Sequence, residues 1–133
     1  MNNYTNILRA HNLKATPQRL EIANALHKYG HVTIENLYEM MHIKFTSISL
    51  ATIYKNINIM MENAFIQEVK IPNDKSVYEL TKEAHSHLVC THCGEIEDIT
   101  LDITSLMEEA MKASHYKIEK SNLVFSGLCQ QCQ

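Results

Sequence analysis

Apolar residues recur at helical spacing through the first half of the chain. Thr16-Pro17 predicts the start of a helix, with threonine as N-cap and proline at the first helical position, and Gly30 predicts its end. A shorter helix precedes it, to about His11. Thr33 and Ser49 can cap two further helices, because the apolar residues after each recur three and four positions apart.

The pattern then changes to that of short strands. Residues 65–71 and Val77–Leu80 are strand-like, and Pro72-Asn73-Asp74 between them is a strong turn signal. Short helices followed by a hairpin are the order of a winged helix-turn-helix domain. In that fold the helix over residues 49–63 would be the recognition helix, which reads DNA in the major groove.

The outward face of this helix is predicted to carry Thr52, Lys55 and Asn56. Asparagine can pair with adenine edges, and lysine with phosphate or guanine. An ordinary solvated helix surface explains the same residues equally well, so the pattern alone leaves both interpretations open.

The last third of the chain predicts a small αβ domain after a linker at residues 82–85. Its expected elements are strands over 87–90, Ile96–Ile99 and 117–128, and a helix near Thr104–Ser114. This helix has one apolar side, and pairing two copies of the chain would cover that side and the open strand edges. We therefore predict an α+β protein with a winged-helix domain over 1–81, a hinge over 82–86 and a dimerisation domain over 87–133.

Composition and charge add two constraints. The chain has 133 residues, of which 45% are hydrophobic and 20% charged, and no apolar run is long enough to span a bilayer. Because the start of the sequence has no signal-peptide character, we expect a soluble, cytoplasmic protein with no membrane partner. Residues 1–70 hold seven Lys or Arg against five Asp or Glu, whereas residues 85–133 hold three against seven. A mildly basic front is compatible with DNA binding by that part alone.

The four cysteines form two C-x-x-C pairs, Cys90 with Cys93 and Cys129 with Cys132. This spacing fits a tetrahedral, all-thiolate structural zinc site, since a tight turn aims both thiolates of a pair at one ion. Disulfides and a redox motif are the alternatives. A reducing compartment and the absence of a thioredoxin-like pattern favour zinc.

A second candidate metal site surrounds His85 and His87, which are two apart and so share one side of a strand. Neighbouring candidates are Glu79, Asp98 and His31. Imidazoles with carboxylates suit Fe²⁺, Mn²⁺, Co²⁺, Ni²⁺ or Zn²⁺. His31 and Glu79 belong to the front half, so an ion held by all five would set the orientation of the two halves and act as a switch. Each of these residues alone is also typical of a polar surface.

Taken together, these motifs resemble the ferric uptake regulator family over nearly the whole chain. The resemblance is carried by Leu-Lys-Ala-Thr-Pro-Gln-Arg at 13–19, Ile-Ser-Leu-Ala-Thr-Ile-Tyr-Lys-Asn at 48–56, Ser-Val-Tyr-Glu-Leu at 76–80, His-Ser-His-Leu-Val-Cys at 85–90 and the cysteine pairs. It implies a homodimer that represses genes at palindromic DNA operators when Fe²⁺ or Mn²⁺ is bound.

The resemblance also implies roles for individual residues. The structural zinc ligands fall on Cys90, Cys93, Cys129 and Cys132. The regulatory metal ligands fall on His31, Glu79, His85, His87 and Asp98. The DNA contacts fall on Lys14, Arg19, Thr52, Tyr54 and Lys55.

The signal that is sensed stays open between iron and peroxide. Glu79 resembles iron-sensing members, whereas peroxide-sensing members usually have Asp there. Many iron sensors add a further metal site, and the comparable positions here, Ala84, Ser86 and Ser121, are poor ligands. If peroxide is sensed, the resemblance implies that His31 and His85 are oxidised. Zinc- or nickel-responsive regulation is a further alternative.

Two other classes of protein are alternatives. A small zinc hydrolase or deaminase would need an open metal position and a general acid or base, and the H-x-E…P-C-x-x-C deaminase pattern is absent. The chain also lacks a serine nucleophile motif and a phosphate-binding glycine loop, so we expect no enzyme. The second alternative is a zinc-ribbon interaction module that does not bind DNA.

Overall fold

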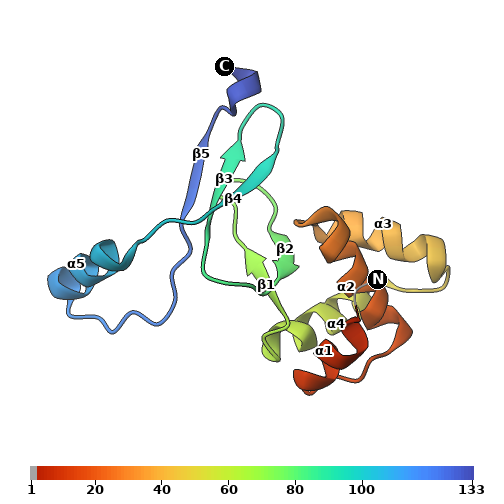
Figure 1. Ribbon diagram of the computed structural model, residues 1–133. Coiled ribbons are helices and arrows are strands. Elements are labelled where there is room, and N and C mark those ends of the chain that lie inside the picture. The colour runs from red at the N-terminus through yellow and green to blue at the C-terminus, as the bar shows by residue number, and fades with distance from the viewer. Residues whose placement is uncertain (1–2) are drawn as a thin grey trace. The chain divides into compact units, whose positions relative to one another are not determined.

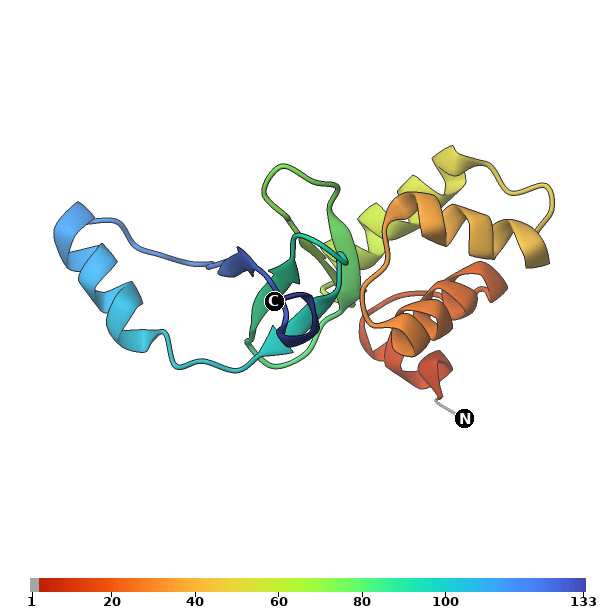
Figure 2. The same ribbon diagram turned by 90° about the horizontal axis from the view of Figure 1, so that it is seen from above.

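The computed structural model describes residues 3–133, which are drawn from two directions in Figures 1 and 2. The chain divides into two compact units, unit 1 ending at Lys82 and unit 2 beginning at Glu83. Among the described residues, every helix is too short or too polar to traverse a bilayer.

Within residues 3–82, unit 1 consists of four helices and a two-stranded hairpin. The elements are α1 (Tyr4–Ala10), α2 (Pro17–Tyr29), α3 (Ile34–Lys44), α4 (Leu50–Glu62), β1 (Ile66–Val69) and β2 (Val77–Leu80). The predicted caps are confirmed: the side-chain oxygens of Thr16, Thr33 and Ser49 each accept a hydrogen bond from the backbone N–H three residues later. Gly30 ends α2 with a φ of 78°, a conformation that glycine adopts without strain.

The helices and the hairpin of unit 1 share one apolar core. Leu8, Leu26, Leu37 and Ile57, from α1 to α4, are fully buried, and Ile66 of β1 packs in the same cluster. The hairpin is antiparallel, and Tyr78 of β2 also pairs with Val32. The hairpin therefore packs against α2 and α4, as the winged-helix prediction requires.

The first strand is shorter than the run of residues 65–71 predicted from sequence. Ala64 follows α4 with a φ of 58°, and the N–H of Phe65 donates to the carbonyl of Met60 at 2.9 Å. This bond closes the end of the helix, so the strand itself begins only at Ile66, although the carbonyl of Phe65 already accepts from the N–H of Thr81. At the other end, the carbonyl of Ile71 accepts from Asp74 in the turn.

Unit 2 contains a three-stranded sheet and one longer helix. The elements are β3 (Ser86–Cys90), β4 (Ile96–Ile99), α5 (Thr104–Ser114), β5 (Val124–Gly127) and the short 3₁₀ helix η1 (Gln130–Cys132). The strand order is β4-β3-β5, with β3 antiparallel to β4 and parallel to β5.

The strand predicted over residues 117–128 is confirmed only at its end, as β5. Its partner β3 has five residues, and the pairing runs from His87 with Val124 to Cys90 with Gly127. The carbonyl of Leu123 still accepts from the N–H of His87 at 3.1 Å, whereas residues 117–122 form no strand.

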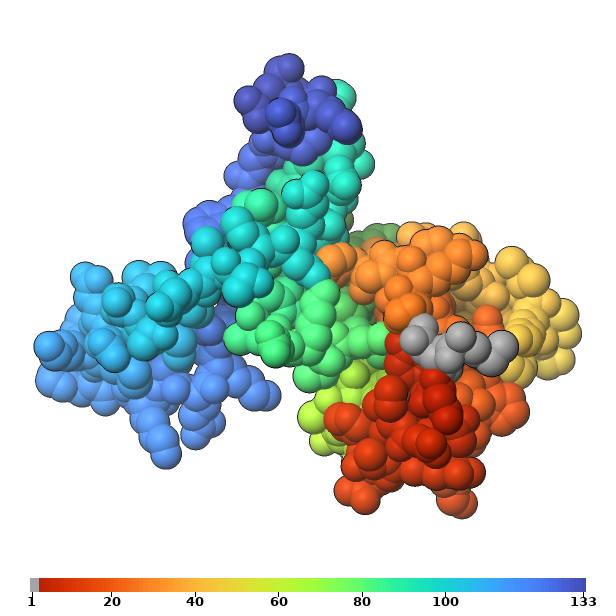
Figure 3. Space-filling model, viewed as in Figure 1, coloured from red at the N-terminus to blue at the C-terminus, as the bar shows by residue number. Residues whose placement is uncertain are grey.

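Unit 2 buries very little apolar surface. Among its residues, all of which the structure describes, Cys90 is the only buried residue of hydrophobic type. The helix α5 has no buried residue, and Leu106 on its apolar side is 55% exposed. Figures 1 and 3 show α5 standing apart from the sheet of its own unit. So small a core must be supplemented by a metal or a partner.

Candidate functional site

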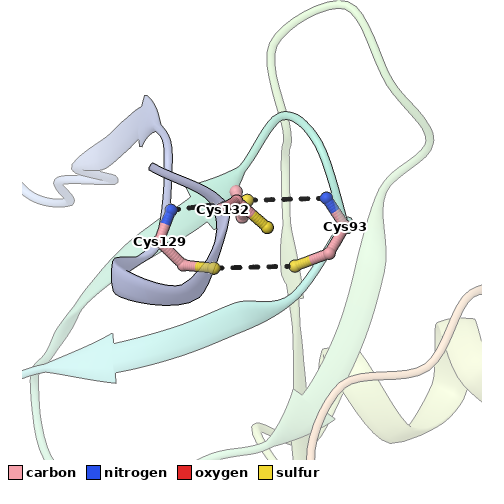
Figure 4. Close-up of side chains that lie close together, drawn as sticks. Cys93, Cys129 and Cys132 are labelled. Atoms are coloured by element: carbon pink, nitrogen blue, oxygen red, sulfur yellow. Dashed lines mark hydrogen bonds between the residues drawn. The ribbon is translucent and has the colours of Figure 1, made fainter.

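The four cysteines converge at one end of the sheet of unit 2. Cys90 ends β3, Cys93 lies in the turn before β4, Cys129 precedes η1 and Cys132 is its last residue. Their sulfur atoms all lie within 4.8 Å of one another, and all four cysteines are free of disulfide bonds. The sulfurs of Cys93 and Cys129 are 3.9 Å apart. Figure 4 shows these two sulfurs pointing toward each other.

This geometry fits a zinc ion. A tetrahedron with Zn–S bonds of about 2.3 Å has sulfur–sulfur edges of about 3.8 Å, whereas a disulfide requires about 2.05 Å. The distance between the Cys93 and Cys129 sulfurs, 3.9 Å, matches the first value. The four residues predicted as structural zinc ligands are thus brought together.

Two backbone N–H groups stabilise a thiolate within this cluster. The N–H of Cys129 and that of Cys93 donate to the Cys90 sulfur at 3.4 and 3.5 Å, and they lower the pKa of Cys90 to about 5. The pKa of Cys132 is raised to about 12, first by its hydrogen bond to the Cys129 side chain and then by burial. For Cys93, the N–H of Glu95 lowers the pKa, but hydrogen bonding to Cys90 and burial outweigh it and the net shift is upward.

Zinc binding by this cluster is expected to weaken steeply as the pH falls. Cys93 and Cys132, with pKa values raised above 9.0, are protonated below that pH and must each release a proton to bind zinc. The apparent affinity should therefore drop at least about 100-fold per pH unit between pH 8 and 6. Competition against a chromophoric zinc chelator at several pH values measures this, and a slope of tenfold or less contradicts it.

Unit 1 carries an imidazole–carboxylate pair. His31 lies between α2 and α3, Glu79 lies in β2, and His31 Nε2 is 2.9 Å from Glu79 Oε2. Gln67 Nε2 donates to the other carboxylate oxygen of Glu79 at 2.7 Å. Sequence reasoning missed Gln67, although the hairpin register, which places it opposite Glu79, contains the signal. We call His31 and Glu79 half-site 1.

Unit 2 carries the complementary group, His85, His87 and Asp98, which we call half-site 2. The Nε2 atoms of His85 and His87 lie 3.7 and 3.4 Å from the same oxygen of Asp98, and the two rings are 4.6 Å apart. Pairing of β3 with β4 places His87 opposite Asp98.

Hydrogen bonding orients His85 within half-site 2. The carbonyl of Glu83 can only accept, so His85 Nδ1, which lies 2.7 Å away, donates to it. This bond directs the other ring nitrogen, Nε2, toward an Asp98 oxygen at 3.7 Å. An imidazole nitrogen and a carboxylate oxygen are both metal ligands, and the Glu83 carbonyl would hold the ring in the orientation that metal binding needs.

The residues predicted to contact DNA all lie in unit 1. Lys14, Tyr54 and Lys55 are exposed. The Thr52 hydroxyl is half-buried and hydrogen-bonded to Ser49 Oγ at 2.9 Å. The fifth residue, Arg19 of α2, donates to Asn56 Oδ1 in α4 and to the carbonyl of Lys14, which precedes α2.

The interpretation that placed Asn56 on the outward face of α4 is wrong. Asn56 is 9% exposed; its Oδ1 accepts from Arg19 Nε at 3.2 Å, and its Nδ2 donates to the carbonyl of Thr52 at 3.1 Å. Asn56 lies three residues after Ile53 and four before Met60, both fully buried, so it borders the apolar face of α4.

These features define a class: a winged-helix protein with a four-thiolate zinc-type centre and imidazole–carboxylate groups in both units. The family model of the ferric uptake regulator family matches residues 10–126. The chain belongs to this family, which confirms the resemblance found in the sequence.

Individual relatives span almost the whole chain. A ferric uptake regulation protein of Bacillus subtilis is 30% identical over 94% of this chain and 89% of its own length. A peroxide operon regulator of the same organism is 28% identical over 94% and 88%. Among solved structures, the peroxide stress regulator of Campylobacter jejuni is 33% identical, covers 98% of this chain and 100% of its own, and has a TM-score of 0.73.

Proposed function

We propose that this chain is a metal-dependent transcriptional repressor that binds a palindromic double-stranded DNA operator as a homodimer. Residues 1–81 form the DNA-binding domain, 82–86 the hinge and 87–133 the dimerisation domain. The winged-helix fold supports the first assignment. The dimerisation assignment is supported by α5, which has an apolar side and no buried residue, and by the exposed Phe125 and Leu128. A second copy of the chain would cover these surfaces.

In this proposal, structural zinc is bound by Cys90, Cys93, Cys129 and Cys132. The ion joins the turn after β3 to η1, two segments far apart in the sequence. With four thiolates its coordination is complete, which is typical of a structural rather than a catalytic zinc site.

The regulatory ion, Fe²⁺ or Mn²⁺, is proposed to bind His31 and Glu79 together with His85, His87 and Asp98. The observation that carries the proposal is that each unit holds one half of a single kind of donor set, imidazole plus carboxylate. An ion that binds both half-sites at once favours one arrangement of the units, so it shifts the population toward that arrangement. In the dimer, this arrangement would present both copies of α4 to successive major-groove faces of the operator.

Recognition of the operator is assigned to two segments of unit 1. Lys14 and Arg19 flank the start of α2, and Thr52, Tyr54 and Lys55 lie on α4. Their support is position and chemistry: the lysines and Tyr54 are exposed, and lysine and arginine carry the charge that phosphates attract.

Selection from a random duplex library tests the repressor function. We expect the zinc-loaded chain to enrich a palindromic sequence when Mn²⁺ is present and to lose that enrichment when Mn²⁺ is withdrawn. Parallel selections with Ni²⁺ and additional Zn²⁺ test the nickel- and zinc-responsive alternatives. If no duplex is enriched with any of these ions, the repressor function is rejected. The remaining interpretation is then a metal-binding interaction module that does not bind DNA.

Peroxide sensing is distinguished from iron sensing by the fate of the ligand histidines. Glu79 favours iron sensing, whereas Ala84, Ser86 and Ser121 at the positions of a further site favour a single regulatory site, as in peroxide sensors. After the Fe²⁺-loaded chain is exposed to dilute peroxide, peptide mass spectrometry should find one added oxygen atom on His31 or His85 if peroxide is sensed. Unmodified histidines, with the Mn²⁺-loaded chain as control, favour iron sensing.

A further inference from the structure

A chain of hydrogen bonds connects the start of α2 to the first turns of α4. Arg19 Nη1 donates to the carbonyl of Lys14 at 3.2 Å, and Arg19 Nε donates to Asn56 Oδ1, also at 3.2 Å. Asn56 Nδ2 continues to the carbonyl of Thr52 at 3.1 Å. The network thus joins three of the residues assigned to DNA binding, Lys14, Arg19 and Thr52, through Asn56, which is itself too buried to reach DNA.

The chemistry of Asn56 suits the task of orienting a cation without neutralising it. Its neutral amide offers an oxygen to Arg19 and keeps the full positive charge of the guanidinium available. The contacts to Asn56 and Lys14 occupy Nε and one Nη1 hydrogen, so terminal donors of the planar fork are left for a phosphate. Aspartate or glutamate at this place would hold Arg19 equally well but cancel its charge.

The location of Asn56 adds a geometric argument. It is one of four buried polar or charged residues among residues 3–133, and unlike Glu79 and His87 it belongs to neither half-site. Burying an amide is unfavourable unless both its oxygen and its nitrogen find partners, and here both do. An apolar residue would suit the border of the core equally well, so folding alone does not account for the amide.

We infer that Asn56 is a positioning residue for DNA recognition, which holds the Arg19 guanidinium at a fixed place between the Lys14 segment and α4 so that it grips one operator phosphate. The inference rests on the proposed repressor function and deepens it. Asn56 itself touches no DNA and acts only through Arg19.

A double-mutant cycle tests the inference on the full zinc- and Mn²⁺-loaded chain, with the duplex enriched by the wild type as probe. Asn56→Ala should weaken binding about tenfold, because the guanidinium is no longer oriented. In the Arg19→Ala background the same substitution should change binding less than twofold. A merely structural role of Asn56 would give equal losses in both backgrounds, and that result overturns the inference.

The salt dependence of binding supplies an independent measurement. Asn56→Asp keeps the size and the acceptor oxygen but neutralises Arg19, so the slope of log K against log salt should become shallower by about 0.9, the value of one phosphate contact. This near-isosteric variant also serves if Asn56→Ala does not fold. A wild-type slope in Asn56→Asp contradicts the inference.

Asn63→Ala is the matched control. Asn63 closes the same helix, and its Nδ2 likewise donates to the carbonyl four residues earlier, that of Ile59, at 2.9 Å, but it has no contact with Arg19. Its binding should stay within twofold of the wild type, and a loss equal to that of Asn56→Ala overturns the assignment. If the wild type enriches no duplex, the repressor function and this inference fall together, whereas enrichment with equal losses in both backgrounds rejects the inference alone.

Discussion

Cys129→Ser is expected to release the structural zinc, unfold unit 2 and abolish the dimer, while unit 1 stays folded. The reason is the near absence of a core in unit 2, where Cys90 is the only buried residue of hydrophobic type and α5 buries nothing. Structural zinc sites contribute about 10–16 kcal/mol of apparent binding free energy, which here is folding free energy. Unit 1 has its own core across α1–α4 and the hairpin, so it does not depend on the ion.

Three measurements test the prediction for Cys129→Ser. Elemental analysis should find less than one structural zinc per chain, light scattering should give the mass of a monomer, and amide NMR should keep dispersed signals only for unit 1. Gln131→Ser is the matched control, since Gln131 lies between the two ligands in η1 and is exposed. A zinc-free Cys129→Ser chain that remains a folded dimer would refute the structural role of the site.

The second large effect is expected for His87→Ala, which removes an imidazole from half-site 2. The Mn²⁺ concentration that gives half-maximal operator binding should rise about 100-fold or more, because loss of even an indirect partner of a metal typically costs 10–100-fold. The zinc content and the dimer should be unchanged, since the sulfur cluster is intact. Fluorescence anisotropy of a labelled operator duplex during Mn²⁺ titration measures the midpoint.

Two further variants make this result specific. Asp98→Asn keeps the size of the side chain and removes only its charge, so it should raise the Mn²⁺ midpoint even if the buried His87 position tolerates alanine poorly. His115→Asn is the control, because His115 has a φ of 60° that asparagine tolerates and belongs to neither half-site. An unchanged Mn²⁺ midpoint in both His87→Ala and Asp98→Asn would reject the regulatory site.

Local chemistry made much of unit 1 predictable from the sequence. A threonine or serine cap precedes each of α2, α3 and α4, and Pro17 adds a second signal at the start of α2. Three of the four helix starts therefore follow from single residues. The burial of Asn56 was not predictable in this way, because a side chain at the border of an apolar helix face can point toward the core or toward the solvent. Its partner Arg19 lies 37 positions away, and only the packed fold brings them together.

In unit 2, the cysteine cluster and the helix were predictable from the sequence, but the length of one strand was not. The cysteine cluster followed from spacing, since C-x-x-C imposes its own turn, and the helix Thr104–Ser114 followed from its apolar periodicity. The length of β5 did not, because a strand ends where its neighbour ends, and β3 offers five residues. The contact of Gln67 with Glu79 likewise depends on hairpin register, which single-residue preferences do not specify.

The position of the two cysteine pairs also governs the timing of biosynthesis. Unit 1 is complete once Lys82 has been made, whereas the sulfur cluster needs Cys132, fifty residues later. At about 5–20 residues per second, the 39 residues from Cys93 to Cys132 take roughly 2–8 s to translate, and during this interval Cys90 and Cys93 are a dithiol without their partner pair. The nascent chain can therefore complete the four-thiolate site only after Cys132 has been made, when unit 1 has long been synthesised.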